Sequence, residues 1–191
     1  MIPFFENPLT LTRGRDYSFS ITCTTGRVIY RPVTAIEKSA PVRLTVPTHG
    51  LLPRWAVTPI GRAGSTPLLL VGPQFATIID ADTVELNGRH SLDWQDYVDG
   101  AQLAYNEPLS LASYTATLKV YQQVNDPLPL FTLSEGEGLS VVYGSVSVAF
   151  EAAQTLLIQR PGGSYALSIA DATGNYLLAY GAINLLNVGL P

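Results

Sequence analysis

Two segments constrain the fold of this chain more than any others, because each alternates polar and apolar residues and then enters a turn. Residues 41–51 read Pro-Val-Arg-Leu-Thr-Val-Pro-Thr-His-Gly-Leu, so every second residue from Val42 to Val46 is apolar. Residues 75–87 read Phe-Ala-Thr-Ile-Ile-Asp-Ala-Asp-Thr-Val-Glu-Leu-Asn, two short apolar runs around an acidic turn. A period of two is typical of a half-buried β-strand. The pair therefore predicts a β-domain.

The same alternation recurs along most of the chain, punctuated by Gly, Pro and Asn. It is clearest in residues 17–24, 114–121 and 145–150. Helical signals are few: residues 151–158 are the best candidate, and residues 92–98 could form a helical turn. We predict an all-β protein with one short helix near 151–158.

The composition favours a subunit of an assembly. Charged residues make up only 14% and hydrophobic residues 47%, against a usual charged share of about 25%. With so few charges to cover its outside, the folded chain should expose much neutral or apolar surface. Large exposed apolar patches usually mark contacts with other chains.

Charge and cysteine content argue against several classes of function. The formal net charge is −4, so the basic balance that nucleic-acid binding favours is absent. The single thiol, Cys23, cannot form an internal disulfide, and no Cys/His set has zinc spacing. The N-terminus does not read as a signal peptide, and Gly174 and Asn175 interrupt the uncharged C-terminal stretch. We expect no nucleic-acid partner and no membrane insertion.

The pattern of strand-forming residues changes at two prolines. Pro32 follows the first strands, and Pro108 precedes a return to strands like those of the first 30 residues. The sequence therefore predicts a discontinuous, β-sandwich-like host domain, 1–30 plus 107–191. It is interrupted by a small β-barrel-like inserted module, 31–106.

The host segments carry motifs that resemble a known family. They comprise residues 11–19 (Leu-Thr-Arg-Gly-Arg-Asp-Tyr-Ser-Phe), 108–118, 151–157, and 165–169 followed by 171–175. These resemble the β-sandwich-like domain at the N-terminus of baseplate upper proteins of tailed bacteriophages. One departure is Arg15, where related sequences often carry an acidic residue.

Residues 32–105 resemble a small β-module that is inserted in many phage tail proteins. That module is sometimes likened to a small β-barrel subdomain of ubiquitin-activating enzymes, a similarity of fold that carries no ubiquitin chemistry. The resemblance implies a structural virion component of a tail or baseplate, made in the bacterial host cytoplasm. It also implies other tail, baseplate or fibre proteins as partners, and a homo-oligomer.

Two acidic clusters suggest ligand binding, each with a structural alternative. Asp80 and Asp82 invite a calcium interpretation, but the Gly and the oxygen ligand of an EF-hand loop are missing, and a tight acidic turn explains both. Asp93, Asp96 and Asp99 recur every three residues beside aromatic rings. A solvated face is favoured over a metal or sugar site.

The histidines and the candidate aromatic residues favour a binding role over a catalytic one. His49 and His90 are the only histidines, His49 has no recognisable Ser or Asp partner, and no G-x-S-x-G nucleophile elbow is present. We expect no enzymatic activity, no catalytic or metal-ligating residue and no cofactor. If the chain is instead a receptor- or glycan-binding module at a fibre tip, Trp55, Trp94 and Tyr97 would make the contact.

Overall fold

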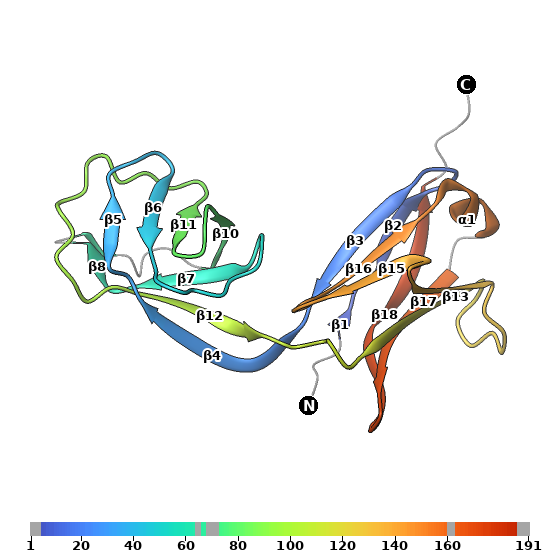
Figure 1. Ribbon diagram of the computed structural model, residues 1–191. Coiled ribbons are helices and arrows are strands. Elements are labelled where there is room, and N and C mark those ends of the chain that lie inside the picture. Colours follow the sequence, from blue (N-terminus) through green and yellow to red (C-terminus); the bar gives the residue numbers. More distant parts are fainter. Residues whose placement is uncertain (1–4, 64–65, 68–72, 160–162, 187–191) are drawn as a thin grey trace. The chain divides into compact units, whose positions relative to one another are not determined.

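The computed structural model describes residues 5–63, 66–67, 73–159 and 163–186 (Figure 1). The regular secondary structure of these residues is nearly all β-strand, with one short helix, α1 (Ala152–Leu157). The predicted all-β class and the helix near 151–158 are confirmed. The sequence also predicts a short strand at residues 68–71, which lies outside the described residues. The one helix of the described segments is too short to cross a membrane.

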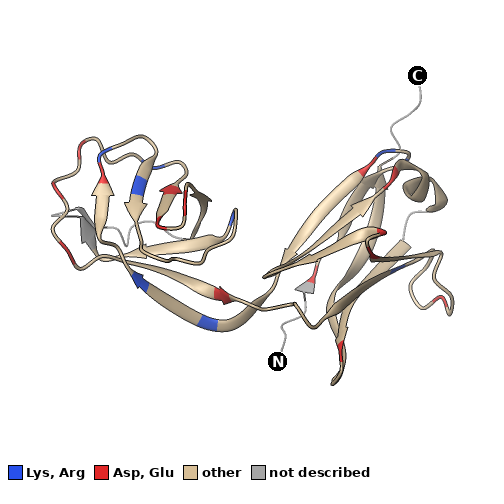
Figure 2. Ribbon diagram, in the orientation of Figure 1, with Lys and Arg blue, Asp and Glu red and all other residues tan. Residues whose placement is uncertain are grey.

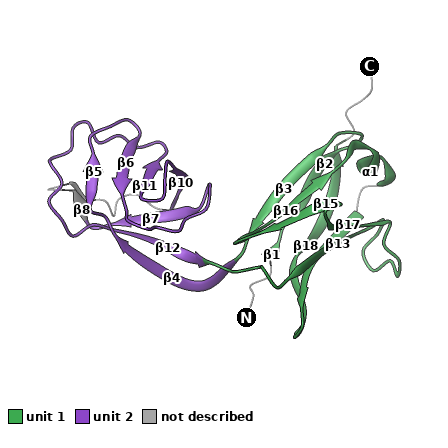
Figure 3. Ribbon diagram, viewed as in Figure 1, with its two compact units in different colours: residues 1–23, 108–191 green, residues 24–107 purple. Residues whose placement is uncertain are grey.

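The chain divides into two compact units (Figure 3). Unit 1 comprises residues 1–23 and 108–191, and unit 2 comprises residues 24–107. The first boundary between the units lies after residue 23, and not after residue 30 as predicted. The reason is that β4 (Thr24–Pro32) pairs with β12 (Gln102–Pro108) inside unit 2. Each unit has its own buried apolar cluster.

Unit 1 contains a nine-stranded sheet that curls around one core. Its order is β1 (Phe5–Glu6), β18 (Gly174–Leu186), β17 (Gly163–Asp171), β13 (Thr115–Tyr121), β14 (Phe131–Glu135), β15 (Gly138–Val142), β16 (Ser145–Phe150) and β3 (Tyr17–Thr22). β2 (Leu9–Thr12) pairs with β18. Because β2 and β3 are consecutive in the chain yet stand at opposite ends of the sheet, the sheet must fold back on itself. The fold-back encloses the apolar faces of the strands, as in a sandwich.

Helix α1 is tied to the turn at residues 13–16. The Thr155 hydroxyl accepts the Gly14 N–H at 3.1 Å and donates to the Arg15 carbonyl at 3.1 Å. At the other end, Asp16 Oδ1 accepts the Ala152 N–H at 2.7 Å. Glu151 and Gln154 complete a capping box. A six-residue helix is marginal by itself, so these contacts fix where it forms.

Unit 2 contains a seven-stranded sheet that nearly closes into a barrel. Its order is β4, β12, β7 (Ala56–Ile60), β10 (Gln74–Ile78), β11 (Thr83–Leu86), β6 (Val42–Thr45) and β5 (Ala35–Glu37). A separate pair is formed by β8 (Arg62–Ala63) and β9 (Thr66–Pro67). The edge strands β4 and β5 are consecutive in the chain, so one continuous segment joins both edges. Backbone bonds from Val33 to Ala101 and from Thr34 to Thr45 anchor the joint.

The predicted helical turn at residues 92–98 is found only at its start. The Trp94 N–H donates to the Ser91 carbonyl at 3.1 Å and closes one turn, and residues 95–98 are irregular. Its side chains are held by residues far away in the sequence: the Tyr97 hydroxyl donates to the Val33 carbonyl at 2.7 Å and accepts the Ala101 N–H at 3.1 Å. Tertiary contacts therefore override the local three-residue spacing of the acids.

Candidate functional site

The two segments that dominate the sequence lie side by side in unit 2. Strand β6, from the first, pairs antiparallel with β11, from the second, in register from Val42 opposite Leu86 to Thr45 opposite Thr83. The turns that follow β6 and precede β11 therefore meet at one end of the barrel. His49 comes from the first turn, and Asp80 and Asp82 come from the second.

His49 is a structural residue that joins the two turns. It is 2% exposed. Its Nδ1 accepts the Leu51 N–H at 3.0 Å, and its Nε2 lies 2.9 Å from the Asp80 carbonyl oxygen. Because a carbonyl only accepts, this pattern makes Nε2 the donor and Nδ1 the acceptor. The Tyr105 hydroxyl donates to the His49 carbonyl. All ring nitrogens are used, so His49 has no free group for chemistry.

The carboxylates of the acidic turn are also engaged in backbone bonds. Asp80 Oδ1 accepts the Asp82 N–H at 2.8 Å, and Asp82 Oδ1 accepts the Thr48 N–H at 2.7 Å. The bond from the Asp82 N–H holds the pKa of the Asp80 carboxyl below its usual value, with the Thr83 hydroxyl adding to the effect. Among the described residues, no three Asp, Glu, His or Cys side chains gather closely enough to hold a metal ion.

The three aromatic residues proposed from sequence as ligand contacts do not form a common surface. Trp55 is 4% exposed, and its Nε1–H donates to the Asn106 carbonyl at 2.9 Å, so it is a core residue of the barrel and cannot stack on a sugar. Trp94 and Tyr97 are partly buried against the same core. The Tyr97 hydroxyl is occupied by the Val33 and Ala101 backbone.

The acids around Trp94 are solvated or paired one by one. Asp96 lies 2.7 Å from the Lys38 Nζ, and Asp93 lies 3.4 Å from the His90 Nδ1. The bond from Lys38 holds the pKa of the Asp96 carboxyl below its usual value. Both pairs are exposed, and each acid has a different partner. The acids of this segment therefore belong to a solvated surface turn.

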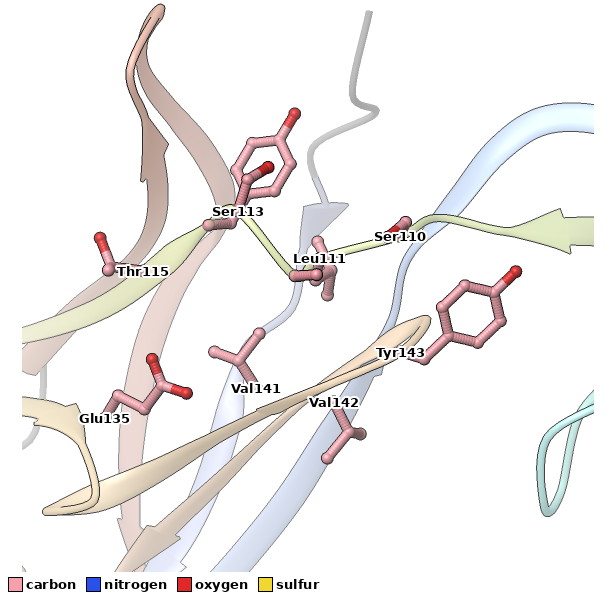
Figure 4. Close-up of a pocket in the computed structure, with 10 residues that line it drawn as sticks. Ser110, Leu111, Ser113, Thr115, Glu135, Val141, Val142 and Tyr143 are labelled. Carbon is pink, nitrogen blue, oxygen red and sulfur yellow. The ribbon is translucent and has the colours of Figure 1, made fainter.

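Unit 1 carries a hollow that the sequence did not reveal (Figure 4). It has a volume of about 400 Å³, and Figure 4 shows Glu135 and Tyr143 at opposite ends of it. Hydroxyls of Ser110, Ser113 and Thr115 also line it. Tyr143 is half exposed. An exposed ring with nearby hydroxyls and one carboxylate can bind a small polar ligand by stacking and hydrogen bonding.

One side of this hollow is stiffened by an aromatic pair. The rings of Tyr114 and Tyr176 meet edge to face with centroids 6.4 Å apart. Partial burial raises the pKa of the Tyr114 hydroxyl, and the Asp171 carboxylate raises it further. Asp171 itself accepts the Thr173 hydroxyl at 2.6 Å and two backbone N–H groups of the β17–β18 turn. The wall is therefore held by several contacts, and the raised pKa keeps the Tyr114 hydroxyl protonated.

Strands β13, β17 and β18 carry few charged residues (Figure 2), and we call their outward side the uncharged face. Its residues alternate with buried ones on each strand: Thr115, Thr117, Lys119, Tyr121, Ser164, Ala166, Ser168, Ala170, Asn175, Leu177, Tyr180, Ala182, Asn184 and Leu186. Lys119 is its only charged member. Surfaces that stay in water usually carry more charge, whereas the centres of protein interfaces are depleted of it.

Protein-family models give no match to this chain, and curated proteins give none either. Function must therefore be argued from the two surfaces of unit 1, the hollow and the uncharged face. The sequence gives one indication of the face: the outward positions of these three strands are mostly Ser, Thr, Asn and Ala, and Lys119 is the one charged residue among them. The hollow gave no such signal, because its lining comes from three separate segments.

Proposed function

We propose that this chain is a non-enzymatic structural component of a bacteriophage virion, a tail or baseplate subunit that positions fibres or neighbouring tail proteins. The uncharged face is the observation that carries the proposal. The outward residues of its central strand, β17, are small: Ala166 stands between Lys119 and Tyr180, and Ser164 stands between Tyr121 and Ala182. Small neutral side chains allow another protein to approach the sheet closely and exclude water.

Two further observations support a structural role. The order of motifs resembles that of phage tail proteins, with host strands, an inserted module and the remaining host strands. The groups that first suggest chemistry, His49 and the acids at 80 and 82, are instead used to hold two turns together. Their role is therefore to stabilise the barrel.

Substitution of Ala166 by Glu tests this proposal. It places a carboxylate at the centre of the uncharged face beside Lys119, a position that remains compatible with folding because it faces outward. We expect incorporation into virions to fall by about tenfold or more, because an interface that buries this charge must desolvate it. Quantitative mass spectrometry of purified particles, produced with each variant supplied in trans, measures the incorporation.

Ser140→Glu is the matched control. Ser140 also points outward from a strand of unit 1, on β15, away from the uncharged face. Its incorporation should equal that of the wild type. If purified virions lack the chain altogether, or if Ala166→Glu assembles as well as the control, the proposal is wrong.

A receptor- or glycan-binding role is the second candidate, and the hollow of Figure 4 favours it. In this role Tyr143 makes the ligand contact, because Trp55, Trp94 and Tyr97 do not form a common surface. We expect that any saturable binding on a glycan array is lost in Tyr143→Ala and kept in Tyr30→Ala, whose ring is similarly exposed in unit 2. Absence of saturable binding by the wild-type chain would remove this candidate.

A further inference from the structure

One end of the uncharged face is hollowed into a groove of about 640 Å³, which we call the groove. Its floor is made of the small residues Ser164, Ala166 and Ala182. In the sheet register Ser164 lies opposite Tyr121, and Ala166 lies opposite Tyr180. One tyrosine therefore stands on each side of the floor, and the floor residues between them have small side chains.

The rim of the groove is apolar and acidic. Val124 and Leu177 line it, with 63% and 44% of their surface exposed. Among the residues that the structure describes, the charged ones that line it are Glu6 and Asp126. Lys119 lies on the same face but does not line the groove. An occupant that suits this rim has apolar side chains next to a cationic one.

Unit 1 itself presents such a surface beside α1, formed by Leu156, Leu157, Arg13 and Arg15, and we call it the corner. Leu156 and Leu157 are 51% and 47% exposed there. Arg13 and Arg15 are exposed beside them, and an Arg13 Nη2–H donates to the Leu156 carbonyl at 3.4 Å. In the part of the chain that the structure describes, neither arginine forms an ion pair.

The acids closest to the corner lie at the opposite end of the helix. Asp16 accepts the Ala152 N–H, and Glu151 belongs to the capping box, both at the N-terminal end of α1. The leucines and the Arg13 contact are at its C-terminal end. The corner is thus apolar with two cations, and the groove is apolar with two acids.

We propose that the corner of one copy of this chain docks in the groove of a second copy. The leucines would fill the space above the small floor, and the arginines would face the two rim carboxylates. Arg suits this role because its guanidinium is weakly hydrated and forms bidentate contacts with carboxylates. This inference rests on the proposed structural function and names one partner of unit 1, a second copy of the chain.

The corner and the groove share no residue, so the contact is heterologous. Each copy can use its corner on one neighbour and its groove on another, and the assembly ends as a ring where the rotation between copies closes. The paired charges lie at an exposed rim, so added salt should weaken the association. A closed ring of three or more copies requires this kind of head-to-tail contact.

Charge reversal tests the contact directly. The corner variant carries Arg13→Glu and Arg15→Glu, and the groove variant carries Glu6→Lys and Asp126→Asn. Asn is chosen at position 126 because Asp126 Oδ2 accepts the Gln123 N–H at 2.8 Å, and an amide oxygen keeps that bond. Sedimentation velocity over a range of concentrations should show self-association of the wild type, weakened about tenfold or more in each variant.

Recombining the variants provides the decisive result. The chain with all four substitutions, and an equimolar mixture of the two variants, should both associate again, because acids and cations then face each other in the reversed sense. Arg54→Glu with Arg89→Glu is the control, since both residues are exposed on unit 2. It should associate like the wild type. Thermal unfolding confirms that each variant is folded.

The possible outcomes separate this inference from the proposed function. A wild-type chain that stays monomeric at all concentrations overturns the corner–groove contact. So does association that persists in both variants, in which case copies meet through another surface. Neither result touches the proposed function, whose test is incorporation into virions. Loss in each variant with recovery in the mixture supports the contact.

Discussion

Replacing Phe150 by alanine is expected to destabilise unit 1 by about 3–5 kcal/mol, because it removes a large ring from a packed core. Phe150 is 1% exposed. Its ring meets Phe131 edge to face at 6.1 Å and packs near Tyr17 and Phe19 at centroid distances of 6.5 and 6.4 Å. These neighbours come from β3 and β14, so one truncation loosens contacts on both sides of the curled sheet.

The two units can be followed separately in this experiment. Both tryptophans, Trp55 and Trp94, lie in unit 2. Urea unfolding followed by circular dichroism should show the unit 1 transition at lower denaturant, while the tryptophan fluorescence transition keeps its midpoint. Tyr143→Ala, an aromatic truncation at a half-exposed site of unit 1, is the control and should cost under about 0.5 kcal/mol. A cost for Phe150→Ala as small as that of the control would contradict this account of the core.

Local alternation was enough to predict most strands of this chain. The second apolar run of residues 75–87 forms β11, and the predicted strand at residues 145–150 coincides with β16. This works because one face of each strand is buried and the other is wet, so the sequence itself carries the period of two. Helix α1 was predictable for a similar reason, since its capping box lies within four residues of sequence.

The failures all involve partners that are distant in the sequence. Residues 24–30 belong to unit 2 because β4 pairs with β12, about eighty positions away, and no local pattern reports that pairing. Trp55 looks like a surface aromatic in sequence, yet the Asn106 carbonyl and the barrel core enclose it. Residues 92–98 have helical spacing of their acids, but bonds to Lys38 and Val33 set their path.

The candidate surfaces were less predictable than the fold. The groove takes its lining from β1, β13, β17, β18 and the loop at residues 122–127. Only the register places Glu6 beside Tyr180, and Tyr180 opposite Ala166. The low charge of the whole chain did point to an interface, but it could not say which strands carry it. That information resides in the pairing order of the sheet.

Replacing His49 by alanine is expected to destabilise unit 2 by about 2–4 kcal/mol. The substitution removes the acceptor of the Leu51 N–H and the donor to the Asp80 carbonyl at a site that is 2% exposed. It therefore leaves a buried backbone donor and a backbone acceptor without partners, each of which costs about 1–3 kcal/mol, and it also opens a cavity. Relaxation of the turn and entry of water reduce the sum. Equilibrium urea unfolding followed by tryptophan fluorescence measures the change, because both tryptophans belong to this unit.

His90→Ala separates this structural role from any general effect of losing an imidazole. His90 is 64% exposed at its side chain and makes only a 3.4 Å contact with Asp93, so its loss should change stability by under about 0.5 kcal/mol. The unit 1 transition, followed by circular dichroism, should not move in either variant. If His49→Ala is as stable as His90→Ala, then His49 does not hold the two turns together, and a ligand-binding or catalytic role for it would have to be tested next.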